Sequence, residues 1–389
     1  MPDISPAQRI NETKEYYFSR KLREVAALNA KGMDIISLGI GGPDLPPHPD
    51  VIHTLCENAS RSDTHGYQLT KGIPALRRAY ADFYLNRFGV VLDPESEILP
   101  LIGSKEGITH ISLAFLNPGD GVLVPNPGYP TYSSVSQIVG AEIFYYDLSE
   151  ENGWQPDFDA LEKLPLDKIK LMWVNYPHMP TGTPATRQLH ERIIDFGLRH
   201  NIVIVHDNPY SLILNPDPRS ILSVPRAMEI AIEMNSLSKG HNMPGWRMAM
   251  CASNPTFIDW ILKIKSNVDS GQYRPMMLAA AEALKLGQDW TDNLNCRYAR
   301  RRKIAEEIMS ALGCSFDPSQ QGLFLWGRIP DAVEDVETFT DDILYNARVF
   351  ITPGFIFGSN GKRYIRISLC ANEDRLHEAL ERIRTFRNK

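Results

Sequence analysis

Seven short apolar runs, separated by stretches with helical periodicity, constrain the fold of this chain more than any other feature. Helical stretches such as residues 105–116 and 188–200 lie between consecutive runs. Parallel strands that are buried on both faces read as continuous apolar runs, and a parallel connection needs a crossover, usually a helix. The sequence therefore predicts an α/β fold whose large domain has a mostly parallel seven-stranded sheet between helices. The predicted strands lie in residues 97–103, 121–127, 141–148, 168–177, 202–209, 227–235 and 246–253.

The pattern of predicted helices and strands changes after about residue 285. A long amphipathic helix is predicted at 290–313, and short strands within 348–354 and 362–370 precede a terminal helix at 371–389. Short strands segregated from helices indicate a smaller α+β domain. We expect the segment before about residue 46 to pack with this domain or with a neighbouring copy. The predicted units are 1–46, an N-terminal arm with part of the small domain; 47–285, the large domain; and 286–389, the small C-terminal domain.

Composition and charge argue against several classes of protein. The chain has 389 residues and a formal net charge of −6, which argues against a nucleic-acid partner. It has no apolar run of about 18 residues and no apolar signal-peptide core, so we expect no membrane partner. The five cysteines are scattered without a Cys-x-x-Cys pair, which favours a reduced cytoplasmic compartment and no structural metal.

The stretch from Ser236 to Arg247 carries the most specific chemical pattern, Ser-Leu-Ser-Lys followed by Gly-Trp-Arg. Lys239 directly follows two hydroxyl side chains, those of Ser236 and Ser238, and Arg247 comes eight residues later. Together these residues supply an amine for an imine, hydroxyls for a phosphate and a guanidinium that clamps the phosphate. Pyridoxal 5'-phosphate needs these groups, because it is an electron sink held by a lysine Schiff base. A lone lysine is usually a solvated surface charge, so the whole frame carries this prediction.

The frame resembles the Schiff-base motif of the fold type I pyridoxal-phosphate-dependent aminotransferases of class I/II. The resemblance implies an aspartate aminotransferase-like fold, a cofactor-binding large domain and a catalytic role for Lys239. Asp207 ends the apolar strand at 202–209, and the matching aspartate of the family pairs with the pyridine nitrogen of the cofactor. Its charge keeps that nitrogen protonated, so the ring can accept electrons. Tyr210 matches a tyrosine that donates to the phenolic oxygen of the ring.

The resemblance also implies a phosphate site. Gly103, Ser104 and Lys105 lie between a predicted strand and a predicted helix. Glycine lets the backbone approach an anion there, and the start of a helix donates N–H groups to it. In the family this loop holds the cofactor phosphate. The matching groups are the Ser104 side chain and the Lys105 amide, together with Ser236, Ser238 and Arg247.

The ring of the cofactor has its own set of expected neighbours. Tyr129 matches an aromatic residue that stacks on the pyridine ring, whereas Tyr132 is expected to be structural. Asn175, after the strand at 168–177, is a further cofactor-binding candidate. One position departs from the family pattern, because Met179 stands where an asparagine usually precedes Pro-Thr-Gly. A thioether donates no hydrogen bond, so His178 or Asn175 would have to replace the missing donor.

The resemblance assigns the substrate to the C-terminal half and to a second subunit. Arg366 is a charge inside an apolar strand and matches the arginine that binds the substrate α-carboxylate bidentately. Gly41 matches a glycine that lies over the same carboxylate. Tyr67 matches a tyrosine that reaches the cofactor phosphate of a neighbouring subunit, and Ser270 is a second candidate at that interface. The expected assembly is therefore a homodimer with shared active sites.

The function implied is transfer of the amino group of an L-amino acid to a 2-oxo acid by a ping-pong mechanism. The freed amine of Lys239 would act as general base and general acid. Two alternatives remain open: a β-eliminating carbon–sulfur lyase of the same fold, and a cofactor-binding sensor, which usually carries a fused DNA-binding region. The amino donor stays unspecified, with Arg274 and Arg20 as candidates for a side-chain carboxylate. The motifs look most like the LL-diaminopimelate and alanine aminotransferase-like branch.

Overall fold

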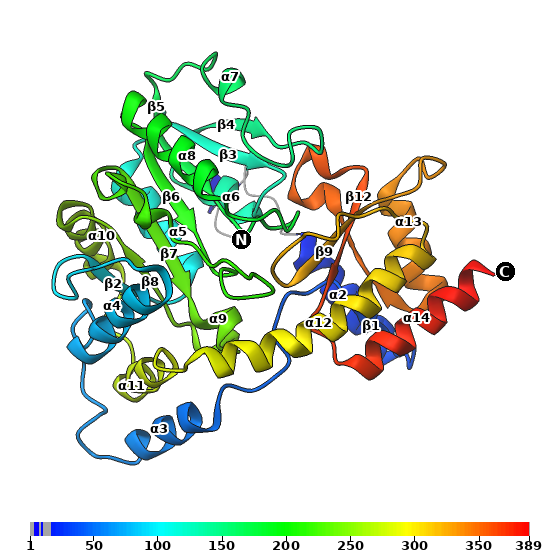
Figure 1. The fold of residues 1–389 in the computed structure, drawn as a ribbon, viewed down its shortest axis with the longest axis horizontal. Helices are drawn as coiled ribbons and strands as arrows, with labels where there is room; N and C mark the ends of the chain where they lie inside the picture. Colours follow the sequence, from blue (N-terminus) through cyan, green and yellow to red (C-terminus); the bar gives the residue numbers. More distant parts are fainter. Residues whose placement is uncertain (1–3, 8, 11–16, 389) are drawn as a thin grey trace.

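The computed structural model describes residues 4–7, 9–10 and 17–388, and its central feature is a seven-stranded sheet (Figure 1). All seven predicted strands join it in the order β2-β8-β7-β6-β5-β3-β4. β8 is antiparallel to both of its neighbours and the other pairs are parallel, so the predicted mostly parallel sheet is confirmed. The strands are β2 (Ile98–Leu101), β3 (Gly121–Asn126), β4 (Glu142–Asp147), β5 (Ile169–Val174), β6 (Val203–Asp207), β7 (Ala231–Ser236) and β8 (Ala249–Ala252).

One predicted strand begins later than its apolar run. The run starts at residue 227, but β7 begins at Ala231 because Ala227–Glu229 forms a short 3-10 turn. Arg226 precedes that turn with a φ of 66°, in the left-handed region, so the chain cannot enter an extended strand there. Apolar character alone therefore overestimates the length of this strand.

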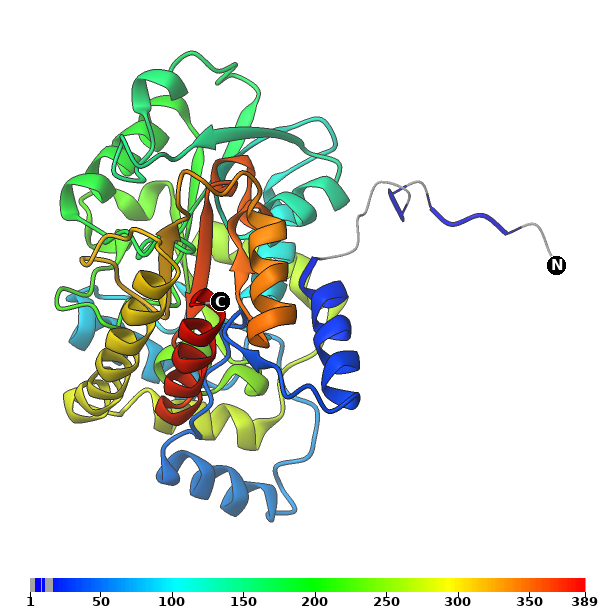
Figure 2. The same ribbon diagram turned by 90° about the vertical axis from the view of Figure 1, so that its right-hand side faces the viewer.

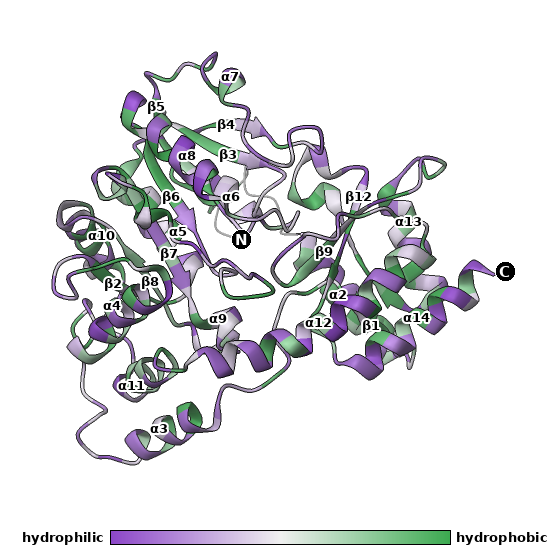
Figure 3. Ribbon diagram, viewed as in Figure 1, coloured by the Kyte–Doolittle hydropathy of each residue, from purple (hydrophilic) through white to green (hydrophobic). Residues whose placement is uncertain are grey.

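Helices cover both faces of the sheet, as the crossover pattern predicts. Side chains of β5 alternate between two cores, with Leu171 and Trp173 on one face and Met172 and Val174 on the other. Helices α5, α6 and α10 pack on the first face, and α4, α8 and α11 pack on the second. Figure 3 shows apolar residues concentrated in the sheet, while helices such as α12 alternate between polar and apolar residues. The period of two along β5 is what places a strand between two helix layers.

The C-terminal elements form a separate hydrophobic core that also takes in the N-terminal segment. Phe18, Val25 and Ile36 pack in this core with residues from 294 to 383. β1 (Ile36–Ser37) pairs with β10 (Val349–Phe350) in parallel, and β11 (Thr352–Pro353), β12 (Tyr364–Ser368) and β9 (Phe324–Arg328) form an antiparallel sheet. Figure 2 shows α2 beside α13, to which Lys21 is tied by an ion pair of 2.6 Å with Asp341.

The N-terminal segment therefore packs against the C-terminal elements of its own chain. The predicted boundaries at residues 46 and 285 remain predictions, and residues 1–3, 8 and 11–16 of the first unit lie outside the described part. Within that described part, no helix is long and apolar enough to cross a membrane. The helices are α2 (Tyr17–Ala30), α3 (Pro49–Ala59), α4 (Pro74–Phe88), α5 (Ser104–Phe115), α6 (Pro130–Ile138), α7 (Phe158–Leu161), α8 (Arg187–His200), α9 (Leu237–Gly240), α10 (Pro255–Val268), α11 (Arg274–Ala283), α12 (Gln288–Ala311), α13 (Val336–Asp342) and α14 (Glu373–Arg387).

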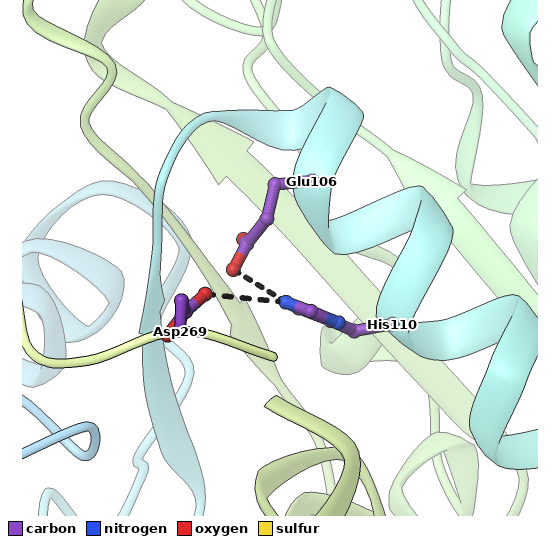
Figure 4. Close-up of side chains that lie close together, drawn as sticks. All are labelled: Glu106, His110 and Asp269. Carbon is purple, nitrogen blue, oxygen red and sulfur yellow. Dashed lines mark hydrogen bonds and ion pairs between the residues drawn. The ribbon is translucent and has the colours of Figure 1, made fainter. Parts of the chain in front are cut away.

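A buried ion cluster fixes the start of α5 against α10 (Figure 4). Glu106 Oε1 lies 2.7 Å from His110 Nε2, and Asp269 Oδ2 lies 3.4 Å from the same nitrogen. Lys265, which is 1% exposed, donates to both carboxylates at 2.6 and 2.7 Å. The other oxygen of Glu106 accepts the Ile102 N–H at 3.0 Å. The cluster therefore holds the strand-to-helix turn before α5, and the Lys265 ammonium offsets part of the negative charge of its two carboxylates.

Replacing Lys265 by methionine should lower the free energy of unfolding by about 3 kcal/mol, because it leaves two carboxylates close together without their buried cation. Lys263 provides a matched control on the same helix, since it is 69% exposed and forms an exposed ion pair with Asp259 one turn away. Lys263→Met should change stability by less than about 0.5 kcal/mol. Urea unfolding of both variants measures the two effects, and equal losses would show that the cluster does not stabilise the fold.

Candidate active site

A cavity of about 370 Å³ opens at the carboxyl ends of β3, β5, β6 and β7. These four strands are parallel neighbours, so the residues that follow them meet at one edge of the sheet. Of the site residues predicted from the sequence, Gly103 and Tyr67 do not line this cavity. The predicted residues that do line it are Gly41, Ser104, Lys105, Tyr129, Asn175, Asp207, Tyr210, Ser236, Ser238, Lys239, Arg247 and Arg366.

Lys239 enters the cavity from the short helix α9, directly after β7. Ser236 caps that helix, because its Oγ accepts the Ser238 N–H at 3.1 Å and donates to the Ser238 hydroxyl at 2.9 Å. The Lys239 amine donates to the carbonyl oxygen of Gly41, which comes from the opposite wall. Burial lowers the pKa of the Lys239 amine below its usual range. A buried amine that loses its proton more readily is a better nucleophile towards a carbonyl group.

Asp207 ends β6 and places a buried carboxylate on the same cavity. Its Oδ2 accepts the Tyr132 hydroxyl at 2.9 Å, while its Oδ1 is buried and has no hydrogen-bond partner among the described residues. Burial raises the pKa of Asp207 to about 6, and the Tyr132 hydrogen bond opposes that shift. A buried acceptor of this kind fits a ligand that offers one N–H group.

Tyr132 was expected to be structural, yet it contacts this carboxylate. Its ring is stacked on Trp173, with centroids 5.0 Å apart and planes 4° apart, and Tyr129 meets it edge-on at 5.5 Å. This stacking fixes the direction of the hydroxyl. Tyr132 lies three residues after Tyr129, on the first turn of α6, and its sequence position alone does not reveal the contact with Asp207.

The start of α5 forms a concave, positively charged corner of the cavity. Gly103 has a φ of 78°, and a Cβ atom there would overlap the Arg247 guanidinium. Gly103 therefore shapes the corner without lining the cavity, since only glycine allows both this backbone and the approach of Arg247. The Ser104 hydroxyl is buried beside it and has no hydrogen-bond partner within the described segments. N–H groups at a helix start, a hydroxyl and a guanidinium form an anion site that fits a phosphate group.

The loop after β5 holds the two side chains that could replace the asparagine donor missing at Met179, Asn175 and His178. Asn175 lines the cavity; its amide nitrogen donates one N–H to the Asp207 carbonyl at 2.5 Å, and its amide oxygen accepts the Met179 N–H at 2.8 Å. His178 does not line the cavity, and its Nδ1 lies 2.8 Å from the Thr181 hydroxyl. The Met179 thioether lies against Arg366 instead, with its sulfur 3.2 Å from Nη1.

Arg366 reaches the cavity from β12 and lies in an aromatic cage. Its guanidinium carbon is 3.8 Å from the ring centroid of Phe324 and 4.5 Å from that of Phe357. The side chain is almost fully buried, at 4% exposure, and its Nη2 donates to the Gly39 carbonyl at 2.9 Å. A guanidinium in such surroundings binds a carboxylate strongly, because little water competes for it.

The remaining candidates lie outside this cavity. Tyr67 is 97% exposed, and Ser270 is exposed nearby, where the Gly271 N–H donates to the Gln68 carbonyl at 3.2 Å. Arg20 lies 3.6 Å from Glu337, and Arg274 begins α11. Neither arginine lines the cavity of its own chain.

The residues present fit pyridoxal 5'-phosphate. Lys239 supplies a buried amine, Asp207 supplies a buried acceptor for a ring N–H, and the corner formed by Ser104 and Arg247 supplies an anion site. All of these groups line or shape one cavity. Their roles towards the cofactor remain predictions.

Comparison with known proteins agrees with this chemistry. A family model described as aminotransferase class I and II matches residues 33–383. The LL-diaminopimelate aminotransferase of Dehalococcoides mccartyi strain 195 is 39% identical over 385 residues, which is 98% of this chain and 99% of that protein. The LL-diaminopimelate aminotransferase of Oleidesulfovibrio alaskensis is 39% identical over 386 residues, again 98% of this chain and 99% of that protein.

Solved structures give the same result for the fold. Substrate-bound BacF from Bacillus subtilis superposes with a TM-score of 0.93 at 35% identity and covers 98% of both chains. Aspartate aminotransferase from Thermotoga maritima superposes with a TM-score of 0.90 at 25% identity and covers 99% of this chain and 100% of that one. The predicted aspartate aminotransferase-like fold is therefore confirmed.

The raised pKa of Asp207 makes the stability of the cofactor-free protein depend on pH. The folded state holds this proton up to about pH 6, whereas the unfolded chain releases it near pH 4. The contribution of Asp207 to stability should therefore fall as pH rises from about 4 to 6, by about 1.4 kcal/mol per pKa unit. Asp207→Asn cannot ionise, so its stability relative to wild type should rise by about 2 to 3 kcal/mol over that range.

Urea unfolding of cofactor-free protein at pH 4 and at pH 7 measures this difference. Asp167 is exposed on the surface, and Asp167→Asn serves as the control, with a much smaller change between the two pH values. A stability difference for Asp207→Asn that is the same at both pH values would contradict the assignment of a raised pKa to this carboxyl group.

Proposed function

Because this chain belongs to the class I and II aminotransferases, we propose that its cavity transfers the amino group of an L-amino acid to a 2-oxo acid through Lys239. The chain is a pyridoxal-phosphate-dependent transaminase, and the alternative of a carbon–sulfur lyase is not favoured by its relatives. The observation that carries the proposal is geometric. The Lys239 amine, the buried Asp207 carboxylate and the Arg366 guanidinium come from separate parts of the chain and line one cavity.

Each group that lines the cavity has its own role in the proposed reaction. The cofactor, when bound, supplies a ring that accepts the electron pair of the substrate α-carbon. Lys239 Nζ attaches the cofactor and then carries the proton that leaves the α-carbon, a task for which its lowered pKa suits it. Asp207 holds the proton on the ring nitrogen, and Tyr132 keeps the Asp207 carboxylate in position through its hydroxyl.

The remaining polar groups bind and orient. Ser104, Ser238 and Arg247, with the N–H groups at the start of α5, form the phosphate site. Arg366 binds the substrate α-carboxylate, and the close backbone of Gly41 limits how the substrate lies. Amino acid and 2-oxo acid both carry that carboxylate, so one arginine serves both halves of a ping-pong cycle.

The amino donor is not specified by these groups, since they bind only the parts that all amino acids share. The relatives described above are named LL-diaminopimelate aminotransferases, so LL-diaminopimelate belongs among the first donors to test, with 2-oxoglutarate and pyruvate as acceptors. Cytoplasmic amino acid metabolism is the setting that we propose, on the cysteine pattern and the substrate class.

Lys239→Ala should abolish transamination, with a loss of at least about a thousand-fold, because it removes both the attachment point and the proton carrier. Borohydride treatment of wild type should fix the cofactor to the peptide that contains Lys239, and mass spectrometry identifies that peptide. Lys285→Ala, at a side chain that is 66% exposed, should keep full activity. Label on any other lysine would contradict the assignment.

We also propose a homodimer in which Tyr67 completes the site of the neighbouring subunit. Tyr67 lies outside the cavity of its own chain, in an exposed apolar patch. The patch adjoins the phosphate corner, because Gln272 donates to the Arg247 carbonyl at 3.0 Å. Large exposed apolar side chains that gather in one place indicate a contact with another protein surface. They are Tyr67, Leu69, Val268 and Tyr273, with exposures of 97%, 79%, 64% and 39%.

Mixing two inactive variants tests the shared site. Lys239→Ala and Tyr67→Ala chains, unfolded and refolded together in equal amounts, should recover about a quarter of wild-type activity, because half of the dimers then hold one intact site. A mixture of Lys239→Ala with Asp207→Ala is the control, since both changes fall on the same side of the site and no intact site can form. Recovery in neither mixture, or an active monomer in light scattering, would rule out shared sites.

A further inference from the structure

The part of the cavity that the cofactor-binding residues do not use is walled by apolar side chains. Six such side chains line it, and they come from α2, from the segment after β1, from the loop after β5 and from the C-terminal region. They are Phe18, Leu22, Ile40, Met179, Phe324 and Phe357. This apolar wall lies around Arg366, because Phe18, Phe324 and Phe357 all have ring centroids within 5.7 Å of its guanidinium carbon.

Helix α2 presents two of these side chains from one face. Phe18 and Leu22 are four residues apart, so they lie one turn apart on the same side of the helix. Lys21, three residues after Phe18, is buried and pairs with Asp341 of α13 at 2.6 Å and with Glu24 of the same helix at 3.1 Å. The ion pair with Asp341 ties α2 to α13, while Phe18 and Leu22 of the same helix line the cavity.

Two members of the wall keep a large area in contact with water. Leu22 is 40% exposed and Ile40 is 36% exposed, although both line the cavity. A ligand that covers such side chains with an apolar group gains free energy in proportion to the area removed from water. A charged ligand group in the same place loses its water shell and gains no hydrogen-bond partner from these side chains, so its binding there is unfavourable.

The charged side chains of the cavity already have tasks under the proposed function. Lys239, Asp207 and Arg247 serve the cofactor, and Arg366 serves the α-carboxylate. Among the described residues, Lys105 is the other charged side chain in the lining, and it lies beside Ser104 at the phosphate corner, on the first turn of α5. A carboxylate bound at Arg366 brings the rest of the amino acid against three phenylalanine rings rather than against a second charge.

We propose that the preferred amino acid substrates of this enzyme carry an apolar side chain, aliphatic or aromatic, which packs on the wall formed by Phe18, Leu22 and Ile40. The inference rests on the proposed transamination and narrows its substrate class. It sets this chain apart from a donor such as LL-diaminopimelate, whose far end carries a second amino group and a second carboxylate.

Equilibrium binding tests the wall without turnover. The holoenzyme is titrated by calorimetry with 3-phenylpropanoate, which is phenylalanine without its amino group, and with glutarate, which is glutamate without its amino group. We expect 3-phenylpropanoate to bind roughly ten- to hundred-fold more tightly, the range expected for burial of one large apolar side chain. Equal affinities, or tighter binding of glutarate, would overturn the inference whether or not the enzyme turns over.

Turnover then tests the substrate class directly. The values of kcat/KM for L-phenylalanine, L-leucine and L-methionine should exceed those for L-glutamate and LL-diaminopimelate by ten-fold or more. Preference for LL-diaminopimelate or L-glutamate would overturn the inference while leaving the proposed function intact. If that preference were lost in Lys105→Met, the ammonium of Lys105 would be the specificity group instead. Absence of turnover with every donor would reject the proposed function, and the binding measurement would still decide on the wall.

A variant of α2 separates a specificity role from a structural one. Leu22→Ala should lower kcat/KM for L-leucine and L-phenylalanine about ten-fold, while the value for L-alanine, whose side chain is too short to reach the wall, changes less than about two-fold. Leu85→Ala on α4 is the matched control, because Leu85 is 49% exposed and lies outside the cavity. Equal losses for all three donors would show that α2 only supports the fold and would overturn the proposed role of the wall.

Discussion

The parallel pairing of β3, β5, β6 and β7 is the constraint on which the rest of the structure depends. Parallel strands point their carboxyl ends in one direction, so every residue that follows a strand arrives at the same edge. That edge lies beyond a sheet packed on both faces, and it is where Lys239, Asp207 and Asn175 meet. The buried Asp207 carboxylate is tolerated there because Tyr132, fixed by its stacking on Trp173, donates to one of its oxygens.

Much of the fold follows from local pattern, and the exceptions have physical causes. A strand buried on both faces appears in the sequence as an apolar run, so the seven strands could be placed from the sequence to within a few residues. The run at 227–235 was too long because a left-handed residue, Arg226, forms a turn that hydropathy does not register. The lysine motif after β7 and Asp207 at the end of β6 could also be found from local pattern, because each stands at the end of an apolar run.

The other side of the site could not be assembled from local pattern. Arg366, Gly41 and Phe18 come together only because β1 pairs with β10 and because α2 packs on the C-terminal core, contacts between segments more than 300 residues apart. The role of Tyr132 was missed for a related reason, since its hydroxyl is directed by a stacking partner from another strand. The family resemblance identified Arg366 and Gly41 as substrate-binding residues, but nothing in the sequence indicated the aromatic cage around Arg366.

Two parts of the chain form the cavity, and their side chains have different roles. The sheet edge holds the groups that do chemistry, while α2 adds only the side chains of Phe18 and Leu22 and is anchored to α13 by Lys21. Phe18 lies near Arg366, whereas Lys239 and Asp207 belong to the sheet edge. During evolution, changes in one short helix near the N-terminus could therefore alter the range of amino acid substrates while the reaction itself stays the same.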